Sequence, residues 1–242
     1  MKNGGIDPIL VRYDHKTMIT DISSGAATGS VTALIRRDIV AGTLALGSRM
    51  KLHDLAARYG CGLMPVRGAL LQLQGEGLVE VTPNCGARVR AVDAEFVANV
   101  FDLRIAIEAL LARRAAERIT PDQIAALEAA QTAFEARIAA ADAPAILRAN
   151  REFHAIVNAA ARNPEATVAI ERQRDLTAAL WSRYGYGTAR AAGAAAEHRQ
   201  LIGALRLRDC DLAVAIATAH AAQARNELLA RMAEMPVIRA AG

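Results

Sequence analysis

Four side chains in the C-terminal half of this 242-residue chain have types and spacing that could hold a metal ion. Asn150 and His154 lie four residues apart on one predicted helix, so both side chains project from the same face. His198 and His220 lie on two later predicted helices. Imidazole nitrogens are good ligands for zinc, nickel, iron or copper, and an amide oxygen can complete a set of four. The spacing alone leaves two interpretations open, namely a shared metal site or separate histidines that are packed and hydrogen-bonded in a core.

The elements that must position these side chains are helices. From residue 93 onward the pattern predicts no strand and six helices, at about residues 93–118, 121–141, 143–161, 164–186, 190–207 and 209–234. Helix-boundary signals separate them, namely Thr120-Pro121, Asp142 with Pro144, Asn163-Pro164, Gly185 to Gly187, and Asp209. Because the connections are short, we predict an antiparallel all-helical bundle over residues 93–235, with a C-terminal tail at residues 236–242.

A different order of elements is predicted for residues 30–92. The pattern gives helices at about residues 30–41, 53–59 and 65–74, then short strands at 78–82 and 87–92 joined by a turn at 83–86. Ser30 is the expected N-cap of the first helix, and Gly60 is the expected C-cap of the second. This order predicts a winged helix-turn-helix, which places one helix in the major groove of DNA. Residues 1–29 hold several glycines without sustained periodicity, and we predict a flexible arm there.

Composition limits the class of protein. Hydrophobic residues make up 53% of the chain and aromatic residues 4%, which favours close-packed, alanine-rich helices over sheets. No run approaches the roughly 18 consecutive apolar residues of a membrane span, and the N-terminus does not resemble a signal peptide. The three cysteines are scattered, so they indicate neither a disulfide framework nor a CxxC metal site. We therefore expect a mainly α, cytoplasmic protein with no membrane partner.

The net positive charge lies entirely in the N-terminal part. Residues 1–92 hold eleven Lys and Arg against seven Asp and Glu, whereas residues 93–242 hold eighteen of each. This excess of four charges supports a nucleic-acid surface in the predicted winged helix-turn-helix.

Two sets of motifs point to one family. The N-terminal part carries Ile39-x-x-Gly42, Leu46-Gly47-x-x-Met50, Leu55-Ala56, Tyr59-Gly60, Pro65-Val66-Arg67, Ala69-Leu70, Leu73, Glu76-Gly77-Leu78-Val79 and Asn84-x-Gly86. The second half carries Phe101-x-x-Arg104-x-x-x-Glu108, Phe153-His154, Asn163, Glu197-His198 and His220. Over about residues 30–235 the chain resembles the GntR family of bacterial transcription regulators, in its FadR-like subgroup with an all-helical FCD effector domain. The resemblance implies a homodimer that binds a double-stranded DNA operator and responds to a small carboxylate effector such as a sugar acid or hydroxy acid.

The contact end of the recognition helix departs from the family pattern. Where the family usually reads something like Val-Ser-Arg-Thr, this chain has Cys61-Gly62-Leu63-Met64. Glycine only partly replaces a serine N-cap, and Leu63 cannot hydrogen-bond a base or a phosphate. Leu63 and Met64 could instead touch thymine methyl groups. Gly68 stands where the family usually has an acidic residue, and glycine weakens a helix by about 1 kcal/mol relative to alanine.

Arginines of the N-terminal part are the remaining DNA-contact candidates. Arg67 follows the family motif and is the first choice for a base or phosphate contact. Arg49 and Arg88, the latter on the wing, are candidates for phosphate contacts, as are Arg36 and Arg37 of the first helix. Each of these side chains has an alternative interpretation as a solvated surface charge.

The resemblance also assigns residues in the helical domain. In metal-binding FCD domains the position of Asn150 is commonly aspartate, and histidines stand at the positions of His154, His198 and His220. This implies a divalent transition metal, zinc first, with nickel, manganese or iron as alternatives. Arg104 could bind an effector carboxylate through two hydrogen bonds or could pair with Glu108, and the two roles are compatible. Further effector-lining candidates are Arg151, Arg174, Arg183 and Tyr184.

Three functions remain to be compared. A ligand-responsive regulator, more specifically a repressor, explains both domains and involves no catalysis. A metal- or ligand-binding module with impaired DNA binding is supported by the Gly62-Leu63-Met64 departure. A metal-dependent enzyme could use the same histidines to activate water, but no general base, nucleophile motif or phosphate loop accompanies them.

Overall fold

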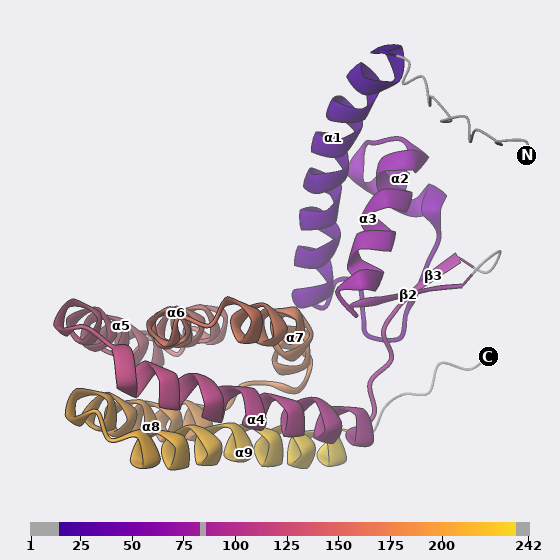
Figure 1. Cartoon of the computed structure of the whole chain (residues 1–242). Coiled ribbons are helices and arrows are strands. Elements are labelled where there is room, and N and C mark those ends of the chain that lie inside the picture. The colour runs from indigo at the N-terminus through magenta and orange to yellow at the C-terminus, as the bar shows by residue number, and fades with distance from the viewer. Residues whose placement is uncertain (1–14, 83–85, 236–242) are drawn as a thin grey trace, which may run out of the picture.

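The structure is a computed structural model that describes residues 15–82 and 86–235, with side chains from Thr28 onward. Within these ranges the chain forms an N-terminal winged helix-turn-helix and a C-terminal all-helical domain, so the predicted fold class is confirmed (Figure 1). The wing turn at residues 83–85, the first 14 residues of the predicted arm and the tail at residues 236–242 lie outside the described residues.

The N-terminal domain consists of α1 (His15–Val40), β1 (Arg49–Met50), α2 (Leu52–Tyr59), α3 (Leu63–Gly75), β2 (Val79–Thr82) and β3 (Gly86–Val89). The strands pair antiparallel in the order β1-β3-β2. The pair β2–β3 forms the predicted wing, and β1 was not predicted because two residues carry no periodicity. Gly60 ends α2 in the left-handed conformation at φ 63°, as expected. On α3 the inward face is the predicted one, made of Val66, Ala69, Leu70 and Leu73.

Helix α1 begins earlier than predicted. It starts at His15 and passes through Ser30, so the prediction of an N-cap at Ser30 and of a flexible arm up to residue 29 is wrong for residues 15–29. Packing explains the continuation, because Thr28 sits against the bare backbone of Gly68 on α3. A Cβ at Gly68 would lie 2.9 Å from the Thr28 Cγ2 atom. One turn later, the Thr32 hydroxyl donates to Gln72 Oε1 on α3 at 3.1 Å.

The helical domain consists of α4 (Ala94–Arg118), α5 (Pro121–Ala139), α6 (Ala143–Ala161), α7 (Pro164–Tyr184), α8 (Thr188–Leu207) and α9 (Cys210–Glu234). All six predicted helices are present, and their ends lie close to the predicted ones. Side chains cap five of them by accepting a backbone N–H, namely Asp93, Thr120, Asp142, Asn163 and Asp209. The long helices α4 and α9 run side by side along one edge of the domain (Figure 1). No helix in the described ranges is long and apolar enough to span a membrane.

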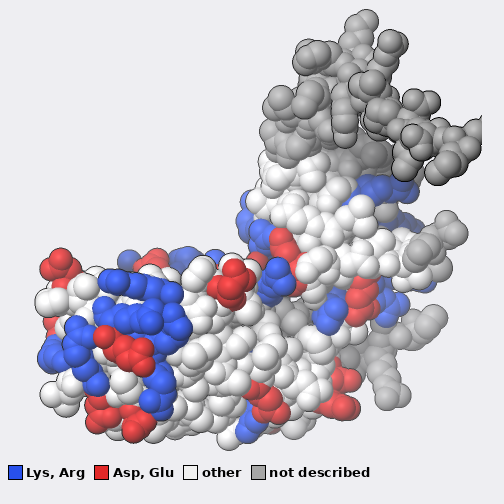
Figure 2. All heavy atoms as spheres, viewed as in Figure 1, with Lys and Arg blue, Asp and Glu red and all other residues white. Residues whose placement is uncertain are grey.

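The two domains meet where α1 approaches α7 (Figure 1). Arg36 of α1 forms an ion pair with Glu76 at the end of α3 and another with Asp175 of α7, the latter at 3.0 Å between Arg36 Nε and Asp175 Oδ2. Figure 2 shows cationic and anionic side chains next to each other along this seam. Helix α7 therefore touches the N-terminal domain directly.

Candidate functional site

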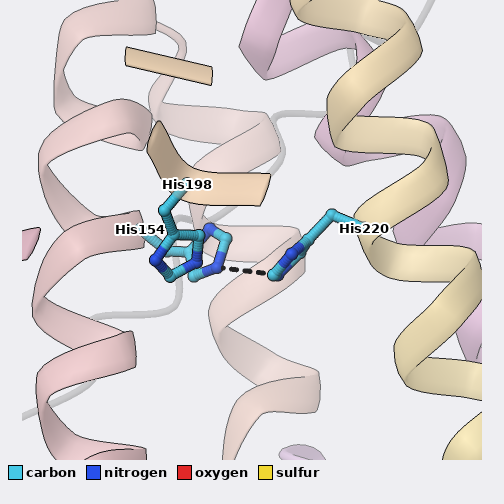
Figure 3. A group of neighbouring side chains, drawn as sticks. All are labelled: His154, His198 and His220. Atoms are coloured by element: carbon cyan, nitrogen blue, oxygen red, sulfur yellow. Dashed lines mark hydrogen bonds between the residues drawn. The ribbon is translucent and has the colours of Figure 1, made fainter. Parts of the chain in front are cut away.

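Three histidines converge in the core of the helical domain. His154 projects from α6, His198 from α8 and His220 from α9, and one ring nitrogen of each lies within 4.8 Å of the others (Figure 3). The Nε2 atoms of His154 and His220 are 3.2 Å apart. His198 is 1% exposed and stacks on Phe153, with ring centroids 4.0 Å apart and an interplanar angle of 8°. The three predicted histidines are thus brought together by three different helices.

Neighbouring polar groups orient two of these rings. Nδ1–H of His198 donates to Gln131 Oε1 of α5 at 3.0 Å, while the Gln131 amide donates to the carbonyl of Ala195. Nδ1–H of His220 donates to Glu197 Oε2 at 2.6 Å. Arg190 holds Glu197 in place through two hydrogen bonds of 3.0 Å, one to each carboxylate oxygen. With Nδ1 protonated, both rings turn an Nε2 lone pair toward the cluster.

Burial lowers the pKa of two of the three histidines, His154 and His198. Burial lowers the pKa of His154 to about 3, and the nearby His220 acts in the same direction. Burial also places the pKa of His198 well below its ordinary value. Burial alone would raise the pKa of Glu108, but Arg104 and the histidines outweigh it and the carboxylate stays ionised. Near neutral pH, His154 and His198 are therefore neutral imidazoles beside an ionised Glu108, and neutral imidazole is the state in which histidine binds metals.

Two buried atoms at this site have no hydrogen-bond partner within the described structure, His198 Nε2 and Asn150 Oδ1. Leaving a buried polar atom unpaired costs about 1–3 kcal/mol. Both atoms are electron-pair donors, and Asn150 lines the same cavity as His154 and His220. The donor set of imidazole nitrogens and an amide oxygen thus fits a divalent transition metal.

A cavity of about 130 Å³ adjoins the cluster. Its volume is comparable to that of a cavity of about 150 Å³ that takes a benzene ring. Four arginines line it against a single carboxylate, Glu108; they are Arg104, Arg151, Arg174 and Arg190. The lining therefore carries a net positive charge and favours an anion.

The lining arginines differ in how firmly they are paired. Arg104 donates to Glu108 at 2.7 and 3.1 Å and to the Thr177 hydroxyl at 3.3 Å, so its predicted ion pair is present at the cavity wall. Arg174 is paired with Glu171. Arg151 is the most loosely held, because its nearest carboxylate oxygens, on Glu171 and Asp175, are 3.8 and 4.0 Å away.

Two predicted effector residues do not line the cavity. Arg183 is exposed and lies over the ring of its neighbour Tyr184, whereas Tyr184 is buried in the apolar core. Both residues lie in the last turn of α7. Their neighbours Trp181 and Tyr186 line the cavity instead. The prediction for Arg183 and Tyr184 is therefore wrong.

The sequence analysis assigned no role to three residues that support the histidines, namely Gln131, Arg190 and Glu197. Gln131 is a polar residue inside the buried stripe of α5, between Leu127 and Phe134. That interruption of an apolar stripe was a usable signal, because a buried amide needs a partner. Arg190 and Glu197 are seven residues apart on α8, which places them on one face, but nothing in their spacing indicates a contact with His220.

The second candidate site is the exposed face of α3. Arg67 is exposed and forms no ion pair with the described part of the chain. Leu63 and Met64, in the first turn of the helix, are 39% and 68% exposed. Gly62 is the N-cap and provides no side-chain hydrogen bond, as the sequence predicts.

Two further predicted cations lie on the sheet next to this helix. Arg49 of β1 stands directly opposite Arg88 of β3, and both are exposed. Like charges directly opposite each other destabilise a sheet. Glu80 flanks Arg88 on the other side, although the ion pair of Glu80 is formed with Arg90 at 3.9 Å. The Arg49–Arg88 pair therefore suits a surface that meets phosphates.

Arg36 and Arg37 differ from the expectation for free phosphate-binding groups. Arg36 is engaged by carboxylates at the domain seam and is therefore not a free cation in this arrangement, so its contact with DNA stays a prediction. Arg37 is 67% exposed and forms an ion pair with Asp38 at 3.2 Å. The carboxylate of Asp38 also accepts hydrogen bonds from Arg58 and the Tyr59 hydroxyl, which ties α1 to α2.

Comparisons with known proteins agree with both domains. The family model for bacterial regulatory proteins of the gntR family matches residues 27–89. The model for the FCD domain matches residues 99–223, about half of the chain. The chain belongs to the GntR family of bacterial regulatory proteins, in the group that carries an FCD domain.

Named relatives are similar over part of their length. The HTH-type transcriptional repressor RspR of Escherichia coli (strain K12) is 36% identical over 106 residues, which cover 44% of this chain and 46% of the relative. The HTH-type transcriptional repressor GlaR of the same strain is 33% identical over 84 residues, covering 35% and 38%. The chain thus matches less than half the length of these two relatives.

Solved structures share the fold over nearly their whole length. The E. coli McbR/YncC structure superposes with a TM-score of 0.73 at 21% identity, over 84% of this chain and 96% of that one. A GntR regulator from Rhodococcus sp. RHA1 gives a TM-score of 0.70 at 19% identity, covering 85% and 98%. At these identities the likeness concerns the fold alone.

The hydrogen bonds at the cluster predict definite tautomers. In chelator-treated protein, His198 and His220 should both carry their proton on Nδ1, because Gln131 and Glu197 accept it. Long-range proton–nitrogen NMR spectra distinguish the two tautomers. In Gln131→Met, His198 should lose this preference while His220 keeps it. Protonation of Nε2 on either ring in the unsubstituted protein would contradict the assigned orientation.

Proposed function

We propose that this protein is a DNA-binding transcription regulator, acting as a repressor, whose affinity for its operator is set by a small carboxylate bound in the helical domain. The observation that carries the proposal is the pairing of two sites in one chain. An exposed recognition helix flanked by unpaired arginines lies in one domain, and a cation-lined cavity with a histidine cluster lies in the other. Family membership and the two relatives named as repressors support it.

On the DNA side, α3 enters the major groove and the wing reaches the backbone. Arg67 contacts a base edge, while Arg49 and Arg88 contact phosphates. The chain acts as a homodimer, so that two α3 helices meet two half-sites of a two-fold symmetric operator.

On the effector side, His154, His198, His220 and the amide oxygen of Asn150 hold a divalent transition metal, zinc first. When bound, the metal supplies open coordination positions for oxygen atoms of the effector. Arg151 and Arg174 receive the effector carboxylate, because their present ion pairs are with Glu171 and Asp175, outside the cavity lining. Arg104 remains paired with Glu108 and closes the wall.

The signal passes through Asp175. This carboxylate lies 3.0 Å from Arg36 of the DNA-binding domain and 4.0 Å from Arg151 at the cavity. A bound carboxylate that draws Arg151 into the cavity removes one of the two cations that face Asp175. The strength of the remaining ion pair between Asp175 and Arg36 then changes. Regulation requires that the effector bind the DNA-competent and DNA-incompetent states with different affinity.

The first prediction concerns DNA binding. Arg67→Ala should weaken binding to operator DNA from upstream of the gene by about 5- to 150-fold, since a good base contact contributes about 1–3 kcal/mol. Fluorescence anisotropy measures the affinity, and Arg137→Ala on α5, also exposed, is the matched control. Equal affinity of the Arg67 variant would remove Arg67 from the interface. Absence of salt-sensitive, selective binding by the unsubstituted protein would favour a module with impaired DNA binding.

The second prediction concerns the metal. Reconstitution with zinc, nickel or manganese should raise Tm by several degrees, because metal at about 100 times its Kd stabilises the folded state by about 2.7 kcal/mol. His198→Ala should abolish the rise and Asn150→Ala should reduce it, whereas His53→Ala, an exposed histidine on α2, should leave it intact. Thermal melts and elemental analysis give the readout. Metal retention by His198→Ala equal to that of the unsubstituted protein would contradict the ligand set.

The third prediction concerns the coupling through Asp175. In Asp175→Asn the ratio of operator affinities without and with effector should fall toward one, from the roughly 5- to 150-fold usual for coupled sites. Operator titrations with a panel of small hydroxy acids and sugar acids measure this ratio. Asp102→Asn is the control, since it breaks an ion pair to Arg225 that involves neither Arg36 nor Arg151. An unchanged ratio in Asp175→Asn would exclude this route.

A further inference from the structure

The exposed face of α3 is apolar where a helix surface is usually polar. Leu63, Met64 and Leu71 are 39%, 68% and 54% exposed. With Arg67 they form a line along one side of the helix, because positions 63, 67 and 71 follow one another at intervals of four residues. We call these four residues the recognition strip.

Packing among the residues whose side chains the structure describes does not account for this strip. The opposite side of α3 already supplies the inward face, with Val66 and Leu73 fully buried. A helix with apolar residues on both sides leaves one side to be covered by something else. Within the strip, Arg67 is the one side chain that can donate a hydrogen bond.

The groove of DNA offers few apolar groups to such a strip. In the major groove, the C5-methyl group of thymine is the apolar feature that distinguishes one base pair from another. A guanine edge presents two acceptors that suit an arginine. The strip is thus chemically complementary to a short DNA sequence in which thymines flank a guanine.

We propose that Leu63, Met64 and Leu71 read thymine methyl groups in the operator, around a guanine contacted by Arg67. This inference rests on the proposed DNA-binding function and adds the basis of its sequence preference. The apolar side chains lose their water against the methyl groups, so removing one methyl weakens binding by about fourfold, the equivalent of about 0.8 kcal/mol per buried carbon.

The surroundings of the strip favour DNA over a protein partner. The exposed pair Arg49 and Arg88 belongs to the same domain, and no carboxylate of the described chain forms an ion pair with either. Lys51, just before α2, is also exposed. An apolar line bordered by free cations complements a groove with apolar methyls between two phosphate chains.

Deoxyuridine substitution tests the proposal directly. Deoxyuridine lacks the C5-methyl of thymidine and keeps its base pairing. After footprinting defines the operator, each thymidine is replaced in turn and affinity is measured by anisotropy. We expect about fourfold losses at two or three thymidines next to one guanine in each half-site, and no loss at flanking positions.

Alanine variants test which side chain causes the loss of affinity at each deoxyuridine. In Leu71→Ala and Leu63→Ala, the thymidine-to-deoxyuridine affinity ratio should fall to about one at the position that each side chain contacts. Both residues are exposed, and thermal melts check that each variant remains folded. Leu103→Ala, an exposed leucine on α4, is the matched control and should keep every ratio.

The possible failures are distinguishable. Selective operator binding that is indifferent to deoxyuridine at every position overturns the thymine proposal and leaves the regulator proposal standing. A lack of selective binding to any duplex overturns both. If Leu63→Ala or Leu71→Ala changes the oligomeric state instead of the ratios, the strip is a contact between chains and the proposal is wrong.

Discussion

The structure depends on the placement of three imidazoles between the helices of the second domain, where buried polar side chains orient two of them. An imidazole in such a place must have a partner for each nitrogen. Gln131 and Glu197 accept from two of the Nδ1 atoms, and the Nε2 atoms of His154 and His220 share a hydrogen bond of 3.2 Å. Nε2 of His198 has no partner in the described part of the chain. This arrangement is costly without a ligand and favourable with one. The metal ion proposed above would remove this cost by binding the unpaired Nε2 of His198.

Helix α7 connects the cavity beside the histidines with the N-terminal domain. The same helix forms a wall of the cavity and, through Asp175, the contact with α1 of the DNA-binding domain. A change in the charges at the cavity can therefore act on the other domain through Asp175 alone. Because each ion pair here is partly exposed, it contributes little to stability by itself. Because these ion pairs are weak, arrangements with different ion-pair partners can lie close in free energy, and a ligand can shift the population between them.

Local signals predicted most of the fold, and long-range contacts account for what they missed. The helices of the second domain end where capping residues such as Thr120 and Asp142 stand, so their boundaries could be predicted. The part of α1 around Thr28 packs on Gly68 of α3, and no local pattern contains that contact. The histidines were found by type and spacing together with the family resemblance. The engagement of Arg36 by Asp175 could not be found, because it joins residues far apart in sequence.

The two departures of α3 from its family have different physical causes. Gly68 is explained by packing, since any larger residue would push against Thr28 and lift α1 from α3. The loss of about 1 kcal/mol in helix propensity at this glycine is offset by the close approach of the two helices. Gly62, Leu63 and Met64 have no such neighbour, and the latter two remain exposed. Selection on packing therefore does not explain these three residues. The proposed contact with thymine methyl groups gives these exposed side chains a physical reason, because it would remove their apolar surface from water.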